Sequence, residues 1–234
     1  MGILAGVAAQ TPGGASDSVC GSLRNHYGPY DYRKDKDKLG VVEQYHFAPE
    51  VEMLIRAQSS RYPSGDISYT LHAFPNHHRA LIAMVKWGER HKSGHPPGTS
   101  RSIDCWFDRA VRFAPNDTIV RVLFAGHLGR TQRLEQAKEQ LARAAEFAGD
   151  NGFSVFNIGI SYFELGDYPS ALKYAHIAQK LGFTRPELQK LLEERNEWKV
   201  MPSEAEKNDS AIESKMSSPE KGAPQTAVPN VDKR

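Results

Sequence analysis

The chain has 234 residues, of which 39% are hydrophobic and 25% charged, a composition typical of a globular core with some unfolded sequence attached. Its 30 Lys and Arg nearly balance 28 Asp and Glu, which argues against a dedicated nucleic-acid binder, because such proteins carry a clear basic excess. Two cysteines exclude a disulfide-rich scaffold and a four-thiolate zinc site, and no apolar run approaches the ~20 residues of a membrane span.

Residues 1–18 are mostly small and apolar, and Val7-Ala8-Ala9 resembles the end of a signal peptide near its cleavage site. A complete signal carries a basic n-region and a longer apolar h-region, and both are missing here. Two interpretations stay open. Residues 1–18 are either the remnant of an export signal behind a start codon placed too far downstream, or a flexible cytosolic N-terminus. We expect a periplasmic or otherwise exported bacterial protein, with a cytoplasmic one as the alternative.

Residues 19–47 are rich in Tyr, Gly and charge and have no clear period, so we expect an irregular N-terminal arm. Cys20 lies in this arm, and the second cysteine is the distant Cys105. In an exported protein we expect the two to form a disulfide, which would close a long loop and be worth on the order of 4–5 kcal/mol in the chain-entropy model. The alternative is two free thiols, with Cys105 buried beside Trp106 and Phe107. The absence of a Cys-x-x-Cys motif gives redox catalysis little support.

Apolar residues recur at helical spacing from about residue 48 onward. We expect a first helix pair at about 48–59 and 66–74. A second pair is expected at about 76–90 and 101–113, joined by a loop rich in Gly and Pro at 91–100.

Five histidines fall within or beside this second pair: His72, His77, His78, His91 and His95. Imidazole suits zinc, copper and nickel, so a metal- or small-ligand-binding site over His72–His95 is one hypothesis. The spacing is irregular, and no acidic or thiolate residue is obviously placed among them. We therefore favour solvent-facing histidines at helix ends and expect no metal site and no cofactor.

An internal repeat relates 119–147 to 153–181, and the numbers of matching residues differ by 34 throughout. The matching pairs are Phe124 and Ile158, Ala125 and Gly159, Leu128 and Tyr162, Ala137 and Ala171, Leu141 and Ala175, and Ala144 and Ala178. Within each copy the apolar residues recur every three or four positions, which predicts two helices per copy.

These residues resemble the tetratricopeptide repeat (TPR) family, whose pattern is W-x2-L-G-x2-Y followed by A-x3-F and a further Ala. The copy at 152–185 matches strongly, with Val155-x2-Ile158-Gly159-x2-Tyr162, the turn Gly166-Asp167-Tyr168, and Ala171-x3-Ala175-x2-Ala178. The copy at 118–151 departs at its first large position, where Arg121 stands. The chain also resembles exported bacterial proteins that carry this repeat behind Cys-Gly-Ser-Leu and Tyr-Gly-Pro segments.

The resemblance implies an all-α fold: a right-handed stack of helix-turn-helix repeats over 48–198 with a C-terminal capping helix. That last helix is expected to open at Thr184 as N-cap and to run to about Trp198. Residues 201–234 contain four prolines and no aromatic residue, so we expect a disordered tail over 199–234.

A stack of this kind has a concave groove lined by the first helix of each unit, and we expect no catalytic residue in it. In the best-matching unit a second apolar stripe (Phe153, Phe156, Ile160, Phe163) needs a cover of its own. Either residues 19–47 or the terminal helix cover it, or it binds a partner. The functional hypothesis is a non-catalytic scaffold or adaptor that holds a peptide or partner helix in this groove, with an undetermined oligomeric state. The expected groove residues are Ile119, Val122, Arg130, Phe153, Phe156, Asn157, Ile160 and Phe163.

Overall fold

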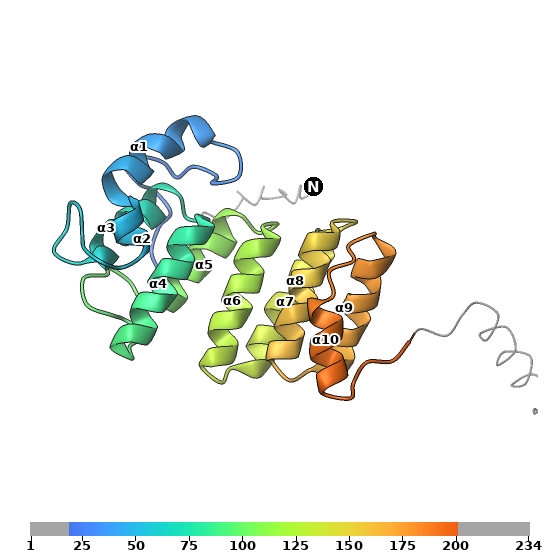
Figure 1. Ribbon diagram of the computed structural model, residues 1–234. Coiled ribbons are helices and arrows are strands. Elements are labelled where there is room, and N and C mark those ends of the chain that lie inside the picture. The colour runs from blue at the N-terminus through green and yellow to red at the C-terminus, as the bar shows by residue number, and fades with distance from the viewer. Residues whose placement is uncertain (1–18, 201–234) are drawn as a thin grey trace, which may run out of the picture. The chain divides into compact units, whose positions relative to one another are not determined.

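Helices are the regular elements of the computed structural model, which describes residues 19–200, and no strand occurs within that range (Figure 1). The all-α prediction is therefore confirmed for this part of the chain. The expectations for 1–18 and for the tail from 201 onward lie outside the described residues. In chain order the helices are α1 (Lys36–His46), α2 (Pro49–Glu52), α3 (Pro63–Ala73), α4 (His78–His91), α5 (Ile103–Phe113), α6 (Thr118–Arg130), α7 (Leu134–Ala148), α8 (Gly152–Glu164), α9 (Tyr168–Lys180) and α10 (Glu187–Glu194).

Two helix hairpins follow the spacing that the sequence predicts. Helix α6 packs against α7, and α8 packs against α9. The first residues of α6 and α8 differ in number by 34 (152 − 118), and those of α7 and α9 differ by the same amount (168 − 134). The N-cap residues are related by this offset too. Asp117 accepts a hydrogen bond from the Val120 N–H, and Asn151 accepts one from the Ser154 N–H.

Small side chains fill the centre of these hairpins. The alanines that match between the two copies are all buried: Ala137 and Ala171, and Ala144 and Ala178. They lie in one apolar core, together with larger residues that fill the space between helices: Leu128, Leu141, Val155, Ile158, Tyr162, Leu188 and Leu192. Helix backbones can approach closely where side chains are this small.

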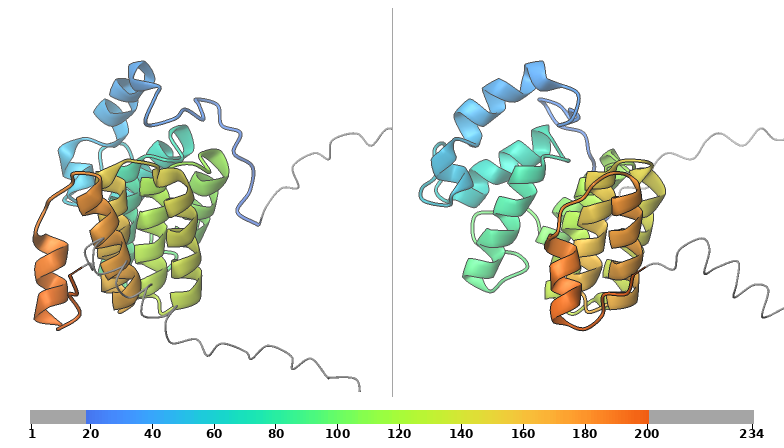
Figure 2. Two further views of the ribbon diagram at one scale, coloured as in Figure 1. Left: turned by 90° about the vertical axis from the view of Figure 1, so that its right-hand side faces the viewer. Right: turned by 45° about the vertical axis from the view of Figure 1, so that its right-hand side comes forward.

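Gly159 marks a close approach between α8, α9 and α10. A Cβ at this position would lie 2.6 Å from Leu188 Cδ2 and 3.2 Å from Tyr174 Cβ. Leu188 is on α10, which packs against both α8 and α9 (Figure 2). A side chain at residue 159 would therefore have to displace Leu188 and press on Tyr174, because α9 and α10 meet α8 on the same side.

Arg121, which stands where the second copy has Val155, is buried, and its guanidinium is hydrogen-bonded. Its Nε donates to the Pro115 carbonyl oxygen at 2.8 Å, and its Nη1 donates to Gln140 Oε1 at 3.0 Å. Its aliphatic stem occupies the buried position and its charged end reaches polar acceptors, as long basic side chains commonly do.

The N-terminal half has its own apolar core, and its residues are larger than those in the core of the two hairpins. Its buried members include Ile67, Leu71, Met84, Trp87, Trp106 and Phe107, which come from α3, α4 and α5. The expected helices at 76–90 and 101–113 correspond to α4 and α5, each starting two residues later than predicted.

Three expectations for individual elements are wrong. The helix expected at 48–59 is the four-residue α2, and Leu54 shortly after it has a φ of 59°, which an α-helix cannot continue through. Residues 36–46 of the expected irregular arm form α1, because Leu39 and Val42, three residues apart, are buried beside Phe74. The last helix is shorter than 184–198, and its N-cap position is Pro186 rather than Thr184.

The arm, residues 19–47, is bonded covalently and through polar groups to the α3–α4 region and to α5. A disulfide joins Cys20 to Cys105 with the Cα atoms 4.9 Å apart, which confirms the predicted pairing. The Tyr30 N–H donates to the Ala73 carbonyl oxygen at 2.8 Å, and the Tyr32 N–H donates to Asn76 Oδ1 at 2.9 Å.

A network of ionic hydrogen bonds continues from these contacts. Asp31 accepts from the Arg33 guanidinium at 2.8 Å and from Asn76 Nδ2 at 2.8 Å, and Asn76 also donates to the buried Asp117. The bond from Arg33 holds the pKa of the Asp31 carboxyl well below its usual range, although partial burial opposes this. The arm is thus tied to the N-cap of α6 by charged groups.

We expect Gly159→Val to lower the free energy of unfolding by about 1–3 kcal/mol, because the added atoms overpack the contact with Leu188 and Tyr174. Gly126→Val is the matched control on α6, where a Cβ would meet only the Arg130 guanidinium at 3.6 Å. Its loss should stay below about 1 kcal/mol. Urea unfolding of both variants measures this, and equal losses would contradict the close approach at Gly159.

Asp31→Asn should destabilise the protein at pH 7 by about 1–2 kcal/mol, because a charge-assisted bond is lost. The folded-state pKa of Asp31 is lowered, so its contribution is complete above the unfolded pKa of about 4 and is lost as pH falls toward the folded value. The difference between wild type and variant should therefore be smaller at pH 3 than at pH 7 in urea unfolding. A difference that is constant or larger at pH 3 would show that Asp31 gains nothing from ionisation.

Candidate functional site

Helices α4, α6 and α8 lie next to one another, with α6 packed against both of the others (Figure 1). Arg130, at the C-terminal end of α6, pairs with Glu89 near the C-terminal end of α4 at 2.8 Å. Asn76 and Asp117, which precede α4 and α6, are bonded at the other end. The two helices therefore run in the same direction, and one side of the α4, α6 and α8 row is left with apolar depressions.

The first depression lies between α6 and α8 and has a volume of about 190 Å³. Its side chains are mostly apolar: Thr118, Ile119, Val122, Leu123, Phe153, Ser154 and Asn157. Phe153 is 52% exposed and Ile119 is 38% exposed. Two large apolar side chains that are this exposed and that line the same depression form a patch rather than isolated surface residues.

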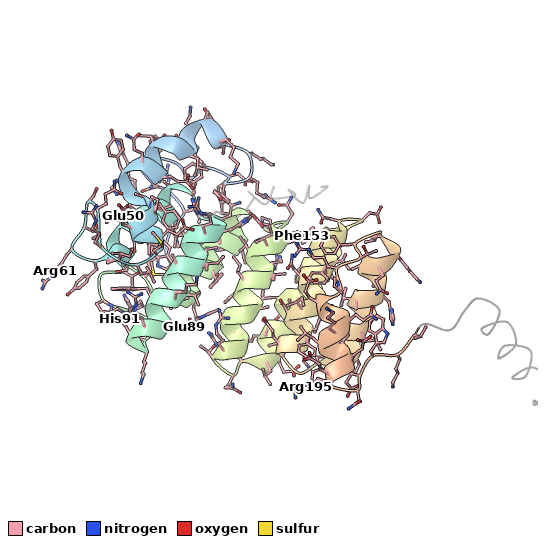
Figure 3. All side chains as sticks on the ribbon, viewed as in Figure 1. Glu50, Arg61, Glu89, His91, Phe153 and Arg195 are labelled. Carbon is pink, nitrogen blue, oxygen red and sulfur yellow. A yellow bond between two sulfur atoms is a disulfide. The ribbon has the colours of Figure 1, made fainter. Side chains whose placement is uncertain are left out.

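The second depression lies between α4 and α6 and has a volume of about 270 Å³. Its lining residues are Ile82, Val85, Lys86, Glu89, Phe107, Leu123 and Arg130. Leu123 lines both depressions, so they form one continuous surface, which we call the α4–α6–α8 surface. In Figure 3 Phe153 marks the end of this surface at the start of α8, and Glu89 marks the end near the last turn of α4.

Charge is concentrated at one end of the α4–α6–α8 surface. Lys86, Glu89 and Arg130 lie together in the second depression, whereas the residues that line the first are uncharged. Asn157 Nδ2 donates to the Phe153 carbonyl oxygen within α8 at 2.9 Å. The surface thus offers an apolar, uncharged half and a half with an ion pair.

The structure brings together five of the eight residues that the sequence predicts for the groove. Four of them line the first depression, Arg130 lines the second, and Phe156, Ile160 and Phe163 line neither. Phe156 is only 8% exposed, because the Phe183 ring covers it at a centroid distance of 5.1 Å. The Phe163 ring contacts Tyr168 at 5.3 Å. The chain itself therefore covers most of the predicted stripe and leaves Phe153 at its edge.

Two kinds of contact were missing from the sequence interpretation. Phe183 lies in the segment between α9 and α10, outside any periodic pattern, so nothing in the sequence signals that it packs on α8. Ile82, Lys86 and Glu89 do have a signal, since they recur at helical spacing along α4. That spacing could have placed α4 on the same surface as α6.

The arm lies elsewhere on the molecule. No residue of 19–47 lines either depression, and the bonds described above join the arm to the α3–α4 region, α5 and the turn at Asn116–Asp117. The α4–α6–α8 surface is therefore not occupied by residues 19–47, whereas α8 receives its internal cover from α9, α10 and Phe183.

The histidines of the region 72–95 are held at separate places. The fully buried His77 caps α4, with its Nδ1 accepting from the Ala80 N–H and its Nε2 3.1 Å from Glu43. Burial lowers the pKa of His77, although Glu43 opposes this. His78 contacts Asp117 at 2.9 Å. The expectation of solvent-facing histidines is wrong for this pair, since both belong to the network that ties the helix N-termini together.

The other histidines contact local groups. His91 Nδ1 is 2.9 Å from the Trp87 carbonyl oxygen, His95 Nε2 is 3.3 Å from the Thr99 carbonyl oxygen, and His72 Nδ1 faces Arg109. Within residues 19–200, no group of three or more His, Cys, Asp or Glu side chains is arranged to hold a metal ion. None of the helices in the same range is long and apolar enough to cross a membrane.

No protein-family model matches the sequence, and neither a curated protein nor a solved structure was found to be significantly similar to it.

Replacing Phe156 by Ala should cost about 3 kcal/mol or more of unfolding free energy, because a buried ring is removed from the α8 core. Phe153→Ala should cost less than half as much, because that ring is half exposed at the edge of the surface. Urea unfolding of the two variants compares neighbouring phenylalanines on one helix. A larger loss for Phe153 would show that it is a core residue rather than part of an accessible patch.

Proposed function

We propose that this chain is a non-catalytic interaction scaffold, built as a right-handed stack of TPR-like hairpins that ends in the capping helix α10. Support for this fold comes from the constant offset between the hairpins α6–α7 and α8–α9, which recurs in the helix starts, N-caps and buried alanines. Leu188 and Leu192 of α10 are buried against the last hairpin, as expected of a cap.

The α4–α6–α8 surface is the proposed binding site. The observation that carries this proposal is the continuous apolar lining shared by three first helices, with Phe153 and Ile119 substantially exposed. Soluble proteins seldom leave such a patch uncovered without an interaction that uses it. The partner is a peptide or a protein helix with spaced apolar anchors, whose polar groups meet Lys86, Glu89 and Arg130 at one end.

An exported, periplasmic protein fits this proposal best. Disulfides persist in oxidising compartments and are rare in the cytosol. The bond between Cys20 and Cys105 supports export, together with the signal-like composition of residues 1–18.

The test is direct binding of peptides selected against the immobilised full-length protein from a displayed library. We expect the selected peptides to carry apolar residues at helical or alternating spacing. Their Kd, measured by fluorescence anisotropy, should rise at least about tenfold in Phe153→Glu and Ile119→Glu, because a buried charge at an apolar anchor costs more than about 1.4 kcal/mol.

Phe147→Glu is the matched control, since Phe147 is 46% exposed but lies on α7, outside both depressions. The affinity of the Phe147→Glu variant for the selected peptides should equal that of the wild type. Peptides that bind all three variants equally well would remove the α4–α6–α8 surface as the binding site.

A further inference from the structure

Three arginine side chains converge on the first residues of the arm. Each guanidinium donates to one of three successive backbone oxygens: Arg101 to Cys20 at 2.7 Å, Arg112 to Gly21 at 2.9 Å, and Arg109 to Ser22. Gly21 has a φ of 77°, which favours glycine, and a Cβ there would lie 2.8 Å from Arg101 Nη1 and so displace the guanidinium. The cluster therefore binds the backbone at and directly after Cys20, which carries one half of the disulfide.

The other half of the disulfide, Cys105, lies on the same helix as two of these arginines. Arg109 and Arg112 follow it by four and seven residues on α5, which places all three on one face of the helix. Cys105 is also in the first turn of α5, where its N–H donates to the N-cap Ser102 at 3.2 Å. A helix N-terminus and neighbouring guanidinium groups both favour a negative charge at this position.

Few negative charges compensate the cluster among the described residues. Asp108 pairs with Arg112 at 2.8 Å. Asp104 is held by Arg133 at 2.6 Å and by His127 at 2.7 Å, on the contact with α6. The remaining neighbour from α3 is His72, whose pKa is lowered to about 4 by burial and by Arg109 and Arg101, so it is neutral near pH 7.

Arg109 is the most constrained member of the cluster. Its side chain is fully buried, and within the described part of the chain its Nε, like that of Arg101, has no hydrogen-bond partner. Burial and the charges of Arg101 and Arg112 lower the pKa of Arg109 to about 10. An anion formed beside these groups would relieve their mutual repulsion.

We propose that Cys20–Cys105 is a redox-reactive disulfide, whose reduction by an external dithiol produces a Cys105 thiolate stabilised by Arg101, Arg109, Arg112 and the N-terminus of α5. The attacking thiolate forms a bond to Sγ of Cys20. The bond between Cys20 and Cys105 breaks, and its electron pair stays on Sγ of Cys105. A leaving thiolate of lowered pKa departs faster and favours the reduced state.

The second thiol of the dithiol completes the exchange. It attacks the mixed disulfide and releases Cys20, and the dithiol becomes a disulfide. The dithiol gives up two electrons and two protons; the protein takes both electrons, Cys20 takes one proton, and the other goes to solvent. This activity is separate from the α4–α6–α8 surface, which contains no part of the cysteine pair.

The test is the pH profile of alkylation in the reduced full-length protein. Iodoacetamide is added between pH 5 and 10, and mass spectrometry of the two cysteine peptides reads Cys20 and Cys105 separately. We expect the midpoint for Cys105 at least one pH unit below the ordinary thiol value of about 8.5, with Cys20 closer to it. A Cys105 midpoint at or above about 8.5 would overturn the proposal.

Arg101→Gln and Arg112→Gln separate the electrostatic effect from a structural one, and neither residue is as buried as Arg109. Each should raise the Cys105 midpoint and lower the equilibrium constant for reduction by dithiothreitol at least about threefold. Arg143→Gln on α7, whose guanidinium pairs with Glu146, is the control and should change neither quantity. Midpoints that are the same in all three variants and the wild type would also overturn the proposal.

Discussion

The close approach of helices at small side chains is the constraint on which the C-terminal half of the structure depends. A Cβ at Gly159 would press on Leu188 and Tyr174, and Ala137 and Ala171 are fully buried at matching positions. Because α8 meets α9 and α10 on the side of Gly159, its other side is directed toward α6 and the α4–α6–α8 surface. The position of Phe153 at the edge of a depression follows from that orientation.

The sequence predicts the parts of the fold that depend on local pattern. The constant offset between the two copies places the starts of α6, α7, α8 and α9, because each copy carries its own cap and its own apolar period. Where the period is short or the cap is absent, prediction is less accurate: α2 ends after four residues, and α10 begins after Pro186 without a side-chain cap. Helix α1 could not be separated from the arm, because Leu39 and Val42 become informative only when Phe74 is known to lie beside them.

The candidate site shows the same division between local and distant information. Ile119, Val122 and Phe153 could be predicted, since each is an apolar residue on the first helix of a repeat unit that the sequence reveals. The burial of Phe156 could not, because it results from Phe183, which follows the whole of α9 in the sequence and lies in no periodic segment. The histidines were misjudged for a related reason. His77 and His78 lie at a helix start, which suggests exposure, but the arm and Asp117 cover them from outside the local sequence.

A row of helices that pack face to face leaves an apolar surface at each end, and this chain covers its two ends by different means. At the C-terminal end α10 inserts Leu188 and Leu192, and apolar burial accounts for most of the contact, beside a hydrogen bond from Gln179 to Gln189 at 3.2 Å. At the N-terminal end the cover is the arm, which buries Leu39, Val42 and Phe47 and carries a disulfide and the Asp31 network in addition. A covalent bond and charged hydrogen bonds add to the apolar burial that offsets the ordering entropy of this segment. Because the residues of 19–47 are bonded elsewhere, none of them lines the apolar depressions between α4, α6 and α8, which is the arrangement that the proposed binding site requires.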